Sequence, residues 1–190
     1  MQKVFSFDAE ADGLLGNPFA IAATVTSPDG VEVATFSLRL DNSVVTNEWV
    51  KEKVLPHIKE IEITPLSKWN QLHNAPVTPE TTAAEYIEFL GEFAKFYLEH
   101  KTDAVIIAHC PTPVEAHLLR EMHRLGLIGD WDGPYPLIGI EGLLDAVGEN
   151  PTEATSYAEK HGLPLPEGSP HNPLYDCRLA ATMYRHLKGW

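Results

Sequence analysis

Apolar and β-branched residues fill the early part of the chain in short runs, which polar turns separate. Residues 2–8 form the first run, and Phe19–Thr26 and Val31–Leu40 form the next two. The segment Ser27–Gly30 contains Pro-Asp-Gly, a strong turn signal, between the second and third runs. The pattern therefore predicts one strand followed by a β-hairpin.

Helical periodicity replaces this pattern further along the chain. Apolar residues recur at helical spacing over Pro79–Glu99, which predicts an amphipathic helix, and Thr78 is a suitable N-cap before the proline. Residues 57–78 show mixed periodicity and are expected to be irregular. Other helices are predicted over Glu48–Leu55, from Thr112-Pro113 onward, over Thr152–His161 and over Pro173–Leu187.

Two further strands are expected between these helices. Ala104–Ala108 is a continuous apolar run, typical of a strand covered on both faces, and Pro136–Ile140 is predicted to be the last strand. Early strands followed by helices that alternate with buried strands indicate an α/β fold with a mixed sheet. No repeat or Pro/Ser linker divides the 190 residues, so residues 1–190 are expected to form a single domain.

Composition narrows the class of protein. No apolar run approaches the roughly 20 residues that span a bilayer, and the N-terminal residues do not resemble a secretory signal. Cys110 and Cys177 lack zinc-type spacing and are expected to be reduced, buried residues. These features predict a cytoplasmic protein with no membrane partner.

The formal net charge of -13 limits the partners of the chain. A protein that binds a long duplex usually carries a basic face, and no Lys/Arg cluster is present here. A short anionic substrate remains compatible with the charge if bound metal ions supply positive charge beside its phosphate.

Candidate chemistry begins at the end of the first strand. Asp8 and Glu10 lie two residues apart, so an extended backbone projects both carboxylates from one face. Their mutual repulsion is relieved most easily by a divalent cation, and Mg²⁺ prefers carboxylate oxygens. Gly13 permits a sharp reversal just beyond the pair, so an ordinary acidic turn is the alternative interpretation.

His171 and Asp176 form a second candidate group. Asn172 is a good N-cap and Pro173 a good first helical residue, which places Asp176 in the first turn of the last helix. An imidazole and a carboxylate near one helix N-terminus suit a metal-bound carboxylate beside a proton acceptor. The alternative is a capped helix preceded by a surface histidine.

Glu115 is the third candidate acid. It follows the strand Ala104–Ala108 at the start of the predicted helix, where ligand groups are common in α/β sheets. The segment Thr112–Glu115 also fits a capping box, in which Glu115 would bond back to the amide of Thr112. Both interpretations remain open from the residues alone. His109, His117 and His123 lie nearby and are expected to be surface or packing residues.

Together these segments resemble the three motifs of the DEDDh, or DnaQ-like, 3′→5′ exonucleases of the ribonuclease H-like superfamily. The segment Phe7–Leu14 is similar to the family's Asp-x-Glu-x-x-Gly-Leu motif, and His171 with Asp176 matches its closing histidine–aspartate spacing. The middle motif, usually His-Asn-x-x-Phe-Asp, is partly present over His109–Glu115, where the acid is Glu and lies one residue farther from the histidine. Trp49–Pro56 is similar to a segment of small bacterial and phage exoribonucleases.

The resemblance implies a ribonuclease H-like domain whose first three strands form an antiparallel meander. It also implies a two-metal phosphodiesterase in which Asp8, Glu10, Glu115 and Asp176 hold two Mg²⁺ or Mn²⁺ ions. His171 would be the general base, and Leu14 would pack against the terminal nucleotide. The expected substrates are the 3′ ends of short single-stranded nucleic acid, with RNA favoured over DNA, and the products are nucleoside 5′-monophosphates. Small relatives are often homodimers.

Two other functions are compatible with the same residues. A non-catalytic nucleic-acid-binding or interaction module of this fold would explain the altered middle motif and the acidic charge, but it would not require His171 and Asp176 together. A metal-dependent endonuclease of the same fold would leave the position of His171 unexplained.

Overall fold

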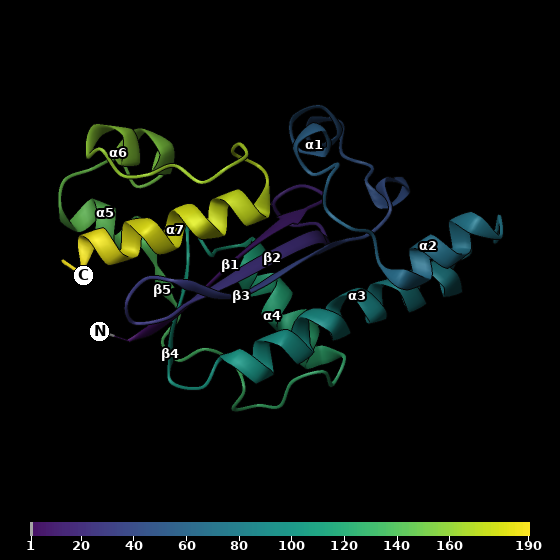
Figure 1. Cartoon of the computed structure of the whole chain (residues 1–190). Helices are drawn as coiled ribbons and strands as arrows, with labels where there is room; N and C mark the ends of the chain where they lie inside the picture. The colour runs from purple at the N-terminus through teal and green to yellow at the C-terminus, as the bar shows by residue number, and fades with distance from the viewer. Residues whose placement is uncertain (1) are drawn as a thin grey trace.

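The computed structural model describes residues 2–190 and contains a five-stranded sheet with the strand order β3-β2-β1-β4-β5 (Figure 1). β1 (Lys3–Ala11), β2 (Pro18–Thr26) and β3 (Glu32–Arg39) form an antiparallel meander. β4 (Ala104–Ala108) pairs parallel to β1, and β5 (Ile138–Gly139) pairs parallel to β4. This arrangement confirms the predicted mixed α/β sheet whose first three strands form an antiparallel meander.

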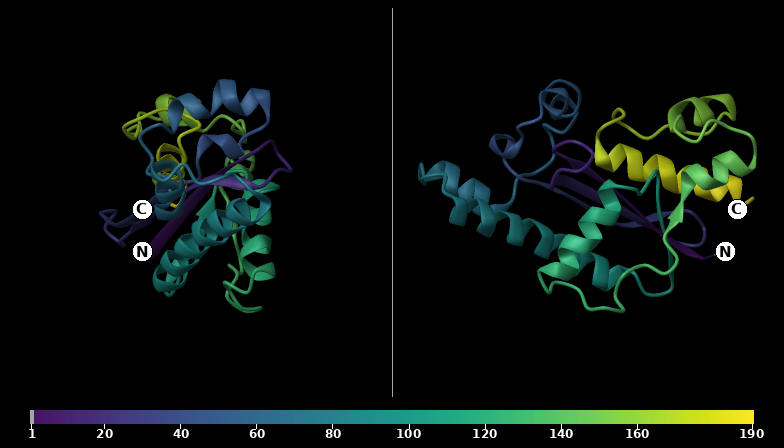
Figure 2. Two further views of the ribbon diagram at one scale, coloured as in Figure 1. Left: turned by 90° about the vertical axis from the view of Figure 1, so that its right-hand side faces the viewer. Right: turned by 180° about the vertical axis from the view of Figure 1, so that it is seen from behind.

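Helices cover both faces of the sheet (Figures 1 and 2). α7 (Pro173–Leu187) packs along β1 and β2 on one face, with α5 (Ile140–Ala146) and α6 (Ala154–Lys160) beside it. α3 (Pro79–His100) and α4 (Val114–Arg124) cover the other face. In the part of the chain that is described, no helix has both the length and the apolarity needed to cross a membrane.

Alternation along β1 assigns its side chains to the two faces. Phe5 contacts Tyr97 of α3 edge to face, with ring centroids 5.7 Å apart, and Phe7 packs against Phe93 at 5.9 Å. The intervening residues of β1 therefore face α7, and these include Asp8. The apolar side of the strand anchors it in the core while its other side presents carboxylates.

Helix N-caps explain where two of the predicted helices begin. Thr78 accepts a hydrogen bond from the amide of Thr81, whose hydroxyl accepts one from the amide of Thr78, so α3 starts with a reciprocal cap. Asn172 caps α7 by accepting from the amide of Leu174 at 3.0 Å. Both caps confirm the positions predicted from the Thr-Pro and Asn-Pro pairs.

The prediction that residues 57–78 are irregular was wrong. α2 (Pro65–Leu72) lies within this range, and Thr64 caps it by accepting from the amide of Ser67 at 3.1 Å. Thr64-Pro65 is the same start signal as Thr78-Pro79, but α2 is short, only its Ser67 is buried, and its apolar Trp69 and Leu72 are exposed.

Several other boundaries differ from the predicted ones. The expected last strand, Pro136–Ile140, is paired only over Ile138–Gly139, because Ile140 begins α5 and buries its side chain there together with Leu144. β1 is longer than predicted and continues to Ala11. The remaining differences are at the ends of short elements. α1 (Glu48–Lys53) lies between two short 3₁₀ helices, η1 (Asn42–Val44) before it and η2 (Leu55–His57) after it. α4 starts at Val114 and α6 at Ala154, each two residues later than predicted.

An ion pair fixes α7 to the edge of the sheet. Arg178 donates two hydrogen bonds of 2.8 Å to the carboxylate of Glu32 at the start of β3. The same carboxylate accepts from the hydroxyls of Thr24 and Thr35. The Arg178 hydrogen bonds lower the pKa of Glu32 to about 2. α7 is thereby held in register with the meander, and α7 carries Asp176.

We expect Glu32→Gln to lower the free energy of unfolding at pH 7 by about 1 kcal/mol, because the pair is partly exposed to solvent. Since the folded-state pKa is below the ordinary value of 4.5, this stabilisation is complete above pH 4.5 and is lost as the pH falls toward 2. Urea unfolding between pH 7 and pH 3 measures the difference between wild type and variant. Glu48→Gln, which removes an exposed pair with Lys51, is the control. A difference that does not shrink below pH 4.5 would contradict this role.

Candidate functional site

Three carboxylates converge at the end of β1. Asp8 and Glu10 project from the same face of the strand, and Asp176 projects from the first turn of α7, which crosses that face. One carboxylate oxygen from each lies within 4.8 Å of the others. The predicted proximity of the first pair is confirmed, and the fold brings the third acid to it across more than 160 residues of sequence. Such an oxygen-rich group has the spacing to hold a metal ion.

Glu115 lies beside this group in the first turn of α4, with only 3% of its surface exposed. Its Oε1 accepts a hydrogen bond of 3.0 Å from the amide of Ala9, between Asp8 and Glu10 in β1. The capping-box interpretation was wrong: Pro113 occupies the N-cap position of α4, and Glu115 bonds to β1 instead of to Thr112. The hydrogen bond ties α4 to the strand.

The four predicted metal ligands and the predicted general base line one cavity of about 480 Å³: Asp8, Glu10, Glu115, Asp176 and His171. The walls come from β1 and the N-terminal turns of α4, α6 and α7, together with the loop after β4. The cavity therefore lies at the carboxyl ends of the parallel strands β1 and β4, the usual location of ligand sites in α/β sheets.

Burial and mutual repulsion hinder ionisation of these acids. Burial is the main cause that raises the pKa of Asp8, and the charges of Asp176, Glu115 and Glu10 add to it. The pKa of Glu115 rises to about 8 and that of Asp176 to about 7, again mainly through burial. The pKa of Glu10 is also raised. Four acids that resist ionisation beside one another form a site whose energy falls when a cation enters.

His171 stands at the mouth of the cavity in the loop before α7. Its Nδ1 lies 3.7 Å from Oε1 of Glu10, and its backbone amide donates a hydrogen bond of 2.9 Å to Oδ2 of Asp176. The backbone φ of +66° turns the loop back toward the acids. The polar contact with Glu10 raises the pKa of the imidazole. The structure thus places a titratable imidazole beside the carboxylates, as the motif spacing predicted.

The segment that contains α1 and η2 contacts the loop of His171. Trp49 of α1 contacts the His171 ring edge to face, with centroids 5.5 Å apart, and remains 55% exposed. Asn172 donates to the carbonyl of His57, and His57 contacts the hydroxyl of Ser169 at 2.8 Å. The segment around α1 and η2 therefore contacts His171 and its loop from outside the acid cluster.

Asp12 is a structural residue of the site that the sequence did not reveal. Its carboxylate accepts hydrogen bonds from the amide and hydroxyl of Thr46 and from the amide of Asn47, at 2.7–3.1 Å. Asp12 thereby connects the β1–β2 loop to the N-terminus of α1. In the sequence, Asp12-Gly13 indicates only a turn. The amides that bond to Asp12 lie more than 30 residues away, so no local pattern predicts these hydrogen bonds.

Leu14 follows Gly13 at the tip of this loop and is 73% exposed. Gly13 adopts a φ of +86°, and a Cβ there would lie 2.9 Å from Nδ2 of Asn47, so both conformation and space require glycine. Leu14 does not belong to the wall of the acidic cavity. Its predicted contact with a nucleotide stays a prediction.

The two cysteines and three further histidines differ in burial and in their contacts near the site. Cys177 is fully buried, as expected, but Cys110 is only partly buried and lines the acidic cavity. His109 contacts the carbonyl of Pro151 at 2.7 Å, which is a packing role. His117 and His123 make exposed polar contacts on α4, in agreement with the prediction that they are surface residues.

Comparisons with known proteins give little further information. The chain matches no protein-family model and no curated protein. Among solved structures it is similar to "Exonuclease X in complex with 5′ overhanging duplex DNA", with 15% sequence identity and a TM-score of 0.49. The similarity covers 100% of this chain and 94% of that chain. A likeness of this size does not assign a function, so the function must be argued from the cavity itself.

The acid cluster predicts a pH-dependent and cation-dependent stability. Because the folded-state pKa values of Glu115 and Asp176 are raised to about 8 and about 7, the destabilisation is complete above pH 8 and is relieved as the pH falls. We expect Asp8→Asn to raise the melting temperature in EDTA at pH 8 by several degrees, at about 2–4 °C per kcal/mol. The gain should shrink toward pH 5.

Scanning calorimetry with Mn²⁺ completes this test. Mn²⁺ should raise the melting temperature of the wild type and leave that of Asp8→Asn nearly unchanged. Glu52→Gln, which removes an exposed carboxylate of α1, should behave as the wild type in both buffers. An Asp8→Asn variant that melts lower than the wild type in EDTA would contradict the repulsion described above.

The contacts of Asp12 predict a local loss of order when they are removed. Asp12→Ala should lower the free energy of unfolding by about 1–2 kcal/mol, because the amides of Thr46 and Asn47 lose their acceptor. Asp12→Asn keeps one acceptor oxygen and should cost less. Hydrogen exchange should accelerate at Thr46 and Asn47 in the alanine variant, and unchanged exchange at both amides would show that Asp12 does not hold this junction.

Proposed function

We propose that this protein is a divalent-metal-dependent 3′→5′ exonuclease that releases nucleoside 5′-monophosphates from short single-stranded nucleic acid, with RNA preferred to DNA. The observation that carries the proposal is the convergence of Asp8, Glu10 and Asp176 within 4.8 Å, in a cavity that Glu115 and His171 also line. The order and spacing of these residues resemble the motifs of DEDDh exonucleases, which supports the polarity of cleavage.

The donor set fits the proposed ions. All four acids offer oxygen ligands, which Mg²⁺ and Mn²⁺ prefer, and burial raises the pKa of each, a penalty on the ionised form that a bound cation would offset. Asp8, Glu10, Glu115 and Asp176 are the residues that would hold two ions. When bound, divalent cations supply the positive charge that activates a water molecule and stabilises an alkoxide leaving group.

His171 is proposed to take the proton from the attacking water. Its imidazole stands at the cavity mouth, where it is accessible to solvent and held by Trp49 on one side and the acid cluster on the other. An imidazole accepts a proton only in its neutral form, and Glu10 is the group that raises its pKa.

The proposed substrate class follows from charge and from the exposed residues beside the cavity. With a net charge of -13, the protein is suited to short strands held near the site rather than to long duplexes. Leu14 and Trp49 both expose apolar surface, and Trp49 contacts His171 of the cavity wall, so both are suited to packing against a terminal nucleotide. The preference for RNA rests on the similarity of Trp49–Pro56 to small exoribonucleases.

A gel time course with 5′-labelled single-stranded RNA and DNA of one sequence tests the proposal. We expect a ladder that shortens from the 3′ end with Mg²⁺ or Mn²⁺ and not with EDTA, faster on RNA. Asp8→Ala should abolish hydrolysis. His171→Ala should slow it by about 10²- to 10⁴-fold, the usual contribution of a general base. His123→Ala, an exposed histidine of α4, is the matched control and should retain the wild-type rate.

Each other outcome has a defined meaning. Cleavage of a circular strand would identify an endonuclease and exclude the exonuclease. Intact substrate in every lane, from folded protein, would contradict the proposed activity and favour the non-catalytic binding module. Wild-type activity of His171→Ala would remove the imidazole from the reaction.

A further inference from the structure

Residues 46–57, which contain α1 and η2, form a strap between the two loops beside the acid cluster (Figure 1). At its first end, two backbone amides of the strap donate hydrogen bonds of 2.8–3.1 Å to Asp12, just after β1. At its last end, His57 contacts the loop before α7. One segment is therefore attached both to the strand that carries two of the acids and to the loop that carries His171.

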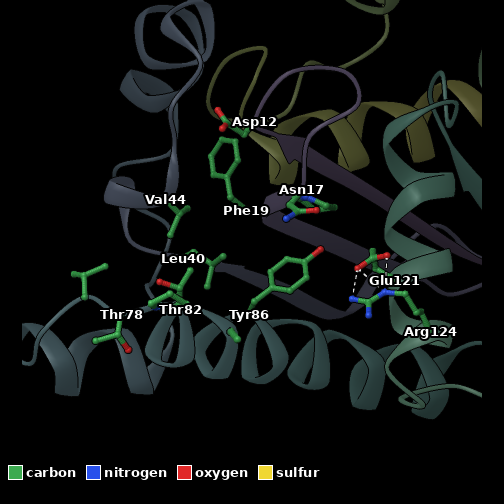
Figure 3. A pocket seen from close by; sticks show the side chains of 14 residues that line it. Asp12, Asn17, Phe19, Leu40, Val44, Thr78, Thr82, Tyr86, Glu121 and Arg124 are labelled. Carbon is green, nitrogen blue, oxygen red and sulfur yellow. Dashed lines mark hydrogen bonds and ion pairs between the residues drawn. The ribbon is translucent and has the colours of Figure 1, made fainter.

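The middle of the strap is fixed by burial. Val50 and Val54 are at most 1% exposed and belong to the apolar core of the domain. Beside the first anchor lies a second cavity of about 900 Å³, with Asp12 and Val44 on its wall (Figure 3). The hydrogen bonds of Asp12 thus hold the strap next to a cavity, and the buried valines give it a fixed base from which its last end can hold a loop.

The loop of His171 needs support from outside. His171 has a backbone φ of +66°, a conformation that non-glycine residues keep only where their surroundings hold it. Its Nδ1 lies 3.7 Å from Oε1 of Glu10, which is too long for a hydrogen bond that would fix the ring. The orientation of the imidazole therefore depends on how the loop itself is held.

His57 supplies the hydrogen bonds that hold this loop. Its Nδ1 lies 2.8 Å from Oγ of Ser169, and its carbonyl accepts a hydrogen bond of 3.0 Å from Nδ2 of Asn172. The two partners lie on either side of His171 in the chain. In the described part of the chain, no other hydrogen bond joins residues 168–172 to a segment beyond this loop and α7.

The bond from Asn172 also reaches the last helix. Oδ1 of the same side chain caps α7, so one amide group connects His57 to the first turn of the helix that carries Asp176. Trp49 of the strap adds its edge-to-face contact with the imidazole of His171. The strap thus contacts the loop before His171, at its ring and after it.

We propose that His57 is a positioning residue for the general base: it holds the loop through Ser169 and Asn172 so that the imidazole of His171 faces the acid cluster. The role rests on the proposed exonuclease function and adds to it a residue that belongs to none of the three motifs. A displacement of about 1 Å in a reacting group costs up to about 10²-fold in rate, so a hold of this kind has a measurable effect.

Direct contact with the substrate is the alternative role for His57. Burial raises the pKa of Glu10, and the charge of His57 is near enough to lower it in part. A histidine that bound a substrate phosphate would act without His171. A positioning residue acts only through His171, so a double variant separates the two roles.

Variants at both ends of the Ser169 contact test the positioning role. His57→Ala and Ser169→Ala remove the contact from opposite sides, and His57→Asn keeps a side-chain amide in place of Nδ1. His123→Ala removes an exposed histidine together with its contact to Asp130, so it is the matched control. His57→Ala is also combined with His171→Ala. Each protein is assayed for kcat and KM on a 5′-labelled single-stranded RNA hexanucleotide with Mn²⁺, and for amide hydrogen exchange by NMR.

We expect His57→Ala and Ser169→Ala each to lower kcat by about 10- to 100-fold with little change in KM, because only the base moves. His57→Asn should recover most of the rate, and the control should match the wild type. In the His171→Ala background, His57→Ala should cause no further loss. The amides of His171 and Asn172, which are hydrogen-bonded in the wild type, should exchange faster in both alanine variants.

A loss in His57→Ala that persists in full in the His171→Ala background would overturn the positioning role, because His57 would then act on the substrate directly. Hydrolysis by the wild type, with kcat and exchange unchanged in His57→Ala, would overturn the role and keep the exonuclease. Faster loop exchange in His57→Ala, from a wild type that hydrolyses no substrate, would reject the exonuclease and keep the hold of His57 on the loop.

Discussion

Repulsion among buried carboxylates is the constraint on which the rest of this structure depends. Asp8, Glu10 and Asp176 bring ligand oxygens within 4.8 Å of one another, and Glu115 adds a fourth acid to the same cavity. Each has a raised pKa, because burial and neighbouring negative charge both penalise the ionised form. The fold must therefore supply enough packing and hydrogen bonding elsewhere to hold these groups together.

That support comes from each element that carries an acid. β1 is anchored by the phenylalanines that it buries against α3, α4 by the hydrogen bond from the Ala9 amide to Glu115, and α7 by the Arg178–Glu32 pair. The loop between β1 and β2 is held by Asp12 against α1. Apart from the hydrogen bond to Glu115, these contacts lie outside the acid cluster, so they do not depend on its protonation state. The result is a preorganised, negatively charged cavity.

Local signals predicted most of the fold and the identity of the acidic residues. Alternation gave the two faces of β1, and the Thr-Pro and Asn-Pro pairs gave the starts of α3 and α7. The eight residues of α2 are too few to show a clear helical period within residues 57–78. The apolar run Pro136–Ile140 is ambiguous because burial in a helix and burial in a strand give the same pattern. The contacts of Asp12 and the bond of Glu115 to Ala9 join segments far apart in sequence, so no local pattern encodes them.

The same limit applies to the two cavities. Motif spacing placed His171 near Asp176, but the contact of Trp49 with the imidazole arises from how α1 packs on the last loop. The second cavity, of about 900 Å³, is lined by the β1–β2 loop, α3 and α4, and it depends on how these elements are placed relative to one another. Residue types alone therefore indicated which acids and which histidine lie together, and not the surfaces around them.

Calorimetric titration of Mn²⁺ into the protein tests the central claim most directly, because it measures cation binding without any substrate. At pH 7.5 the wild type should bind two Mn²⁺ ions per chain with release of protons, since the raised pKa values leave part of the cluster protonated. Asp8→Ala should bind fewer ions. A wild type that binds no more Mn²⁺ than Asp8→Ala would contradict the account, because the carboxylates would then be gathered for a purpose other than holding metal.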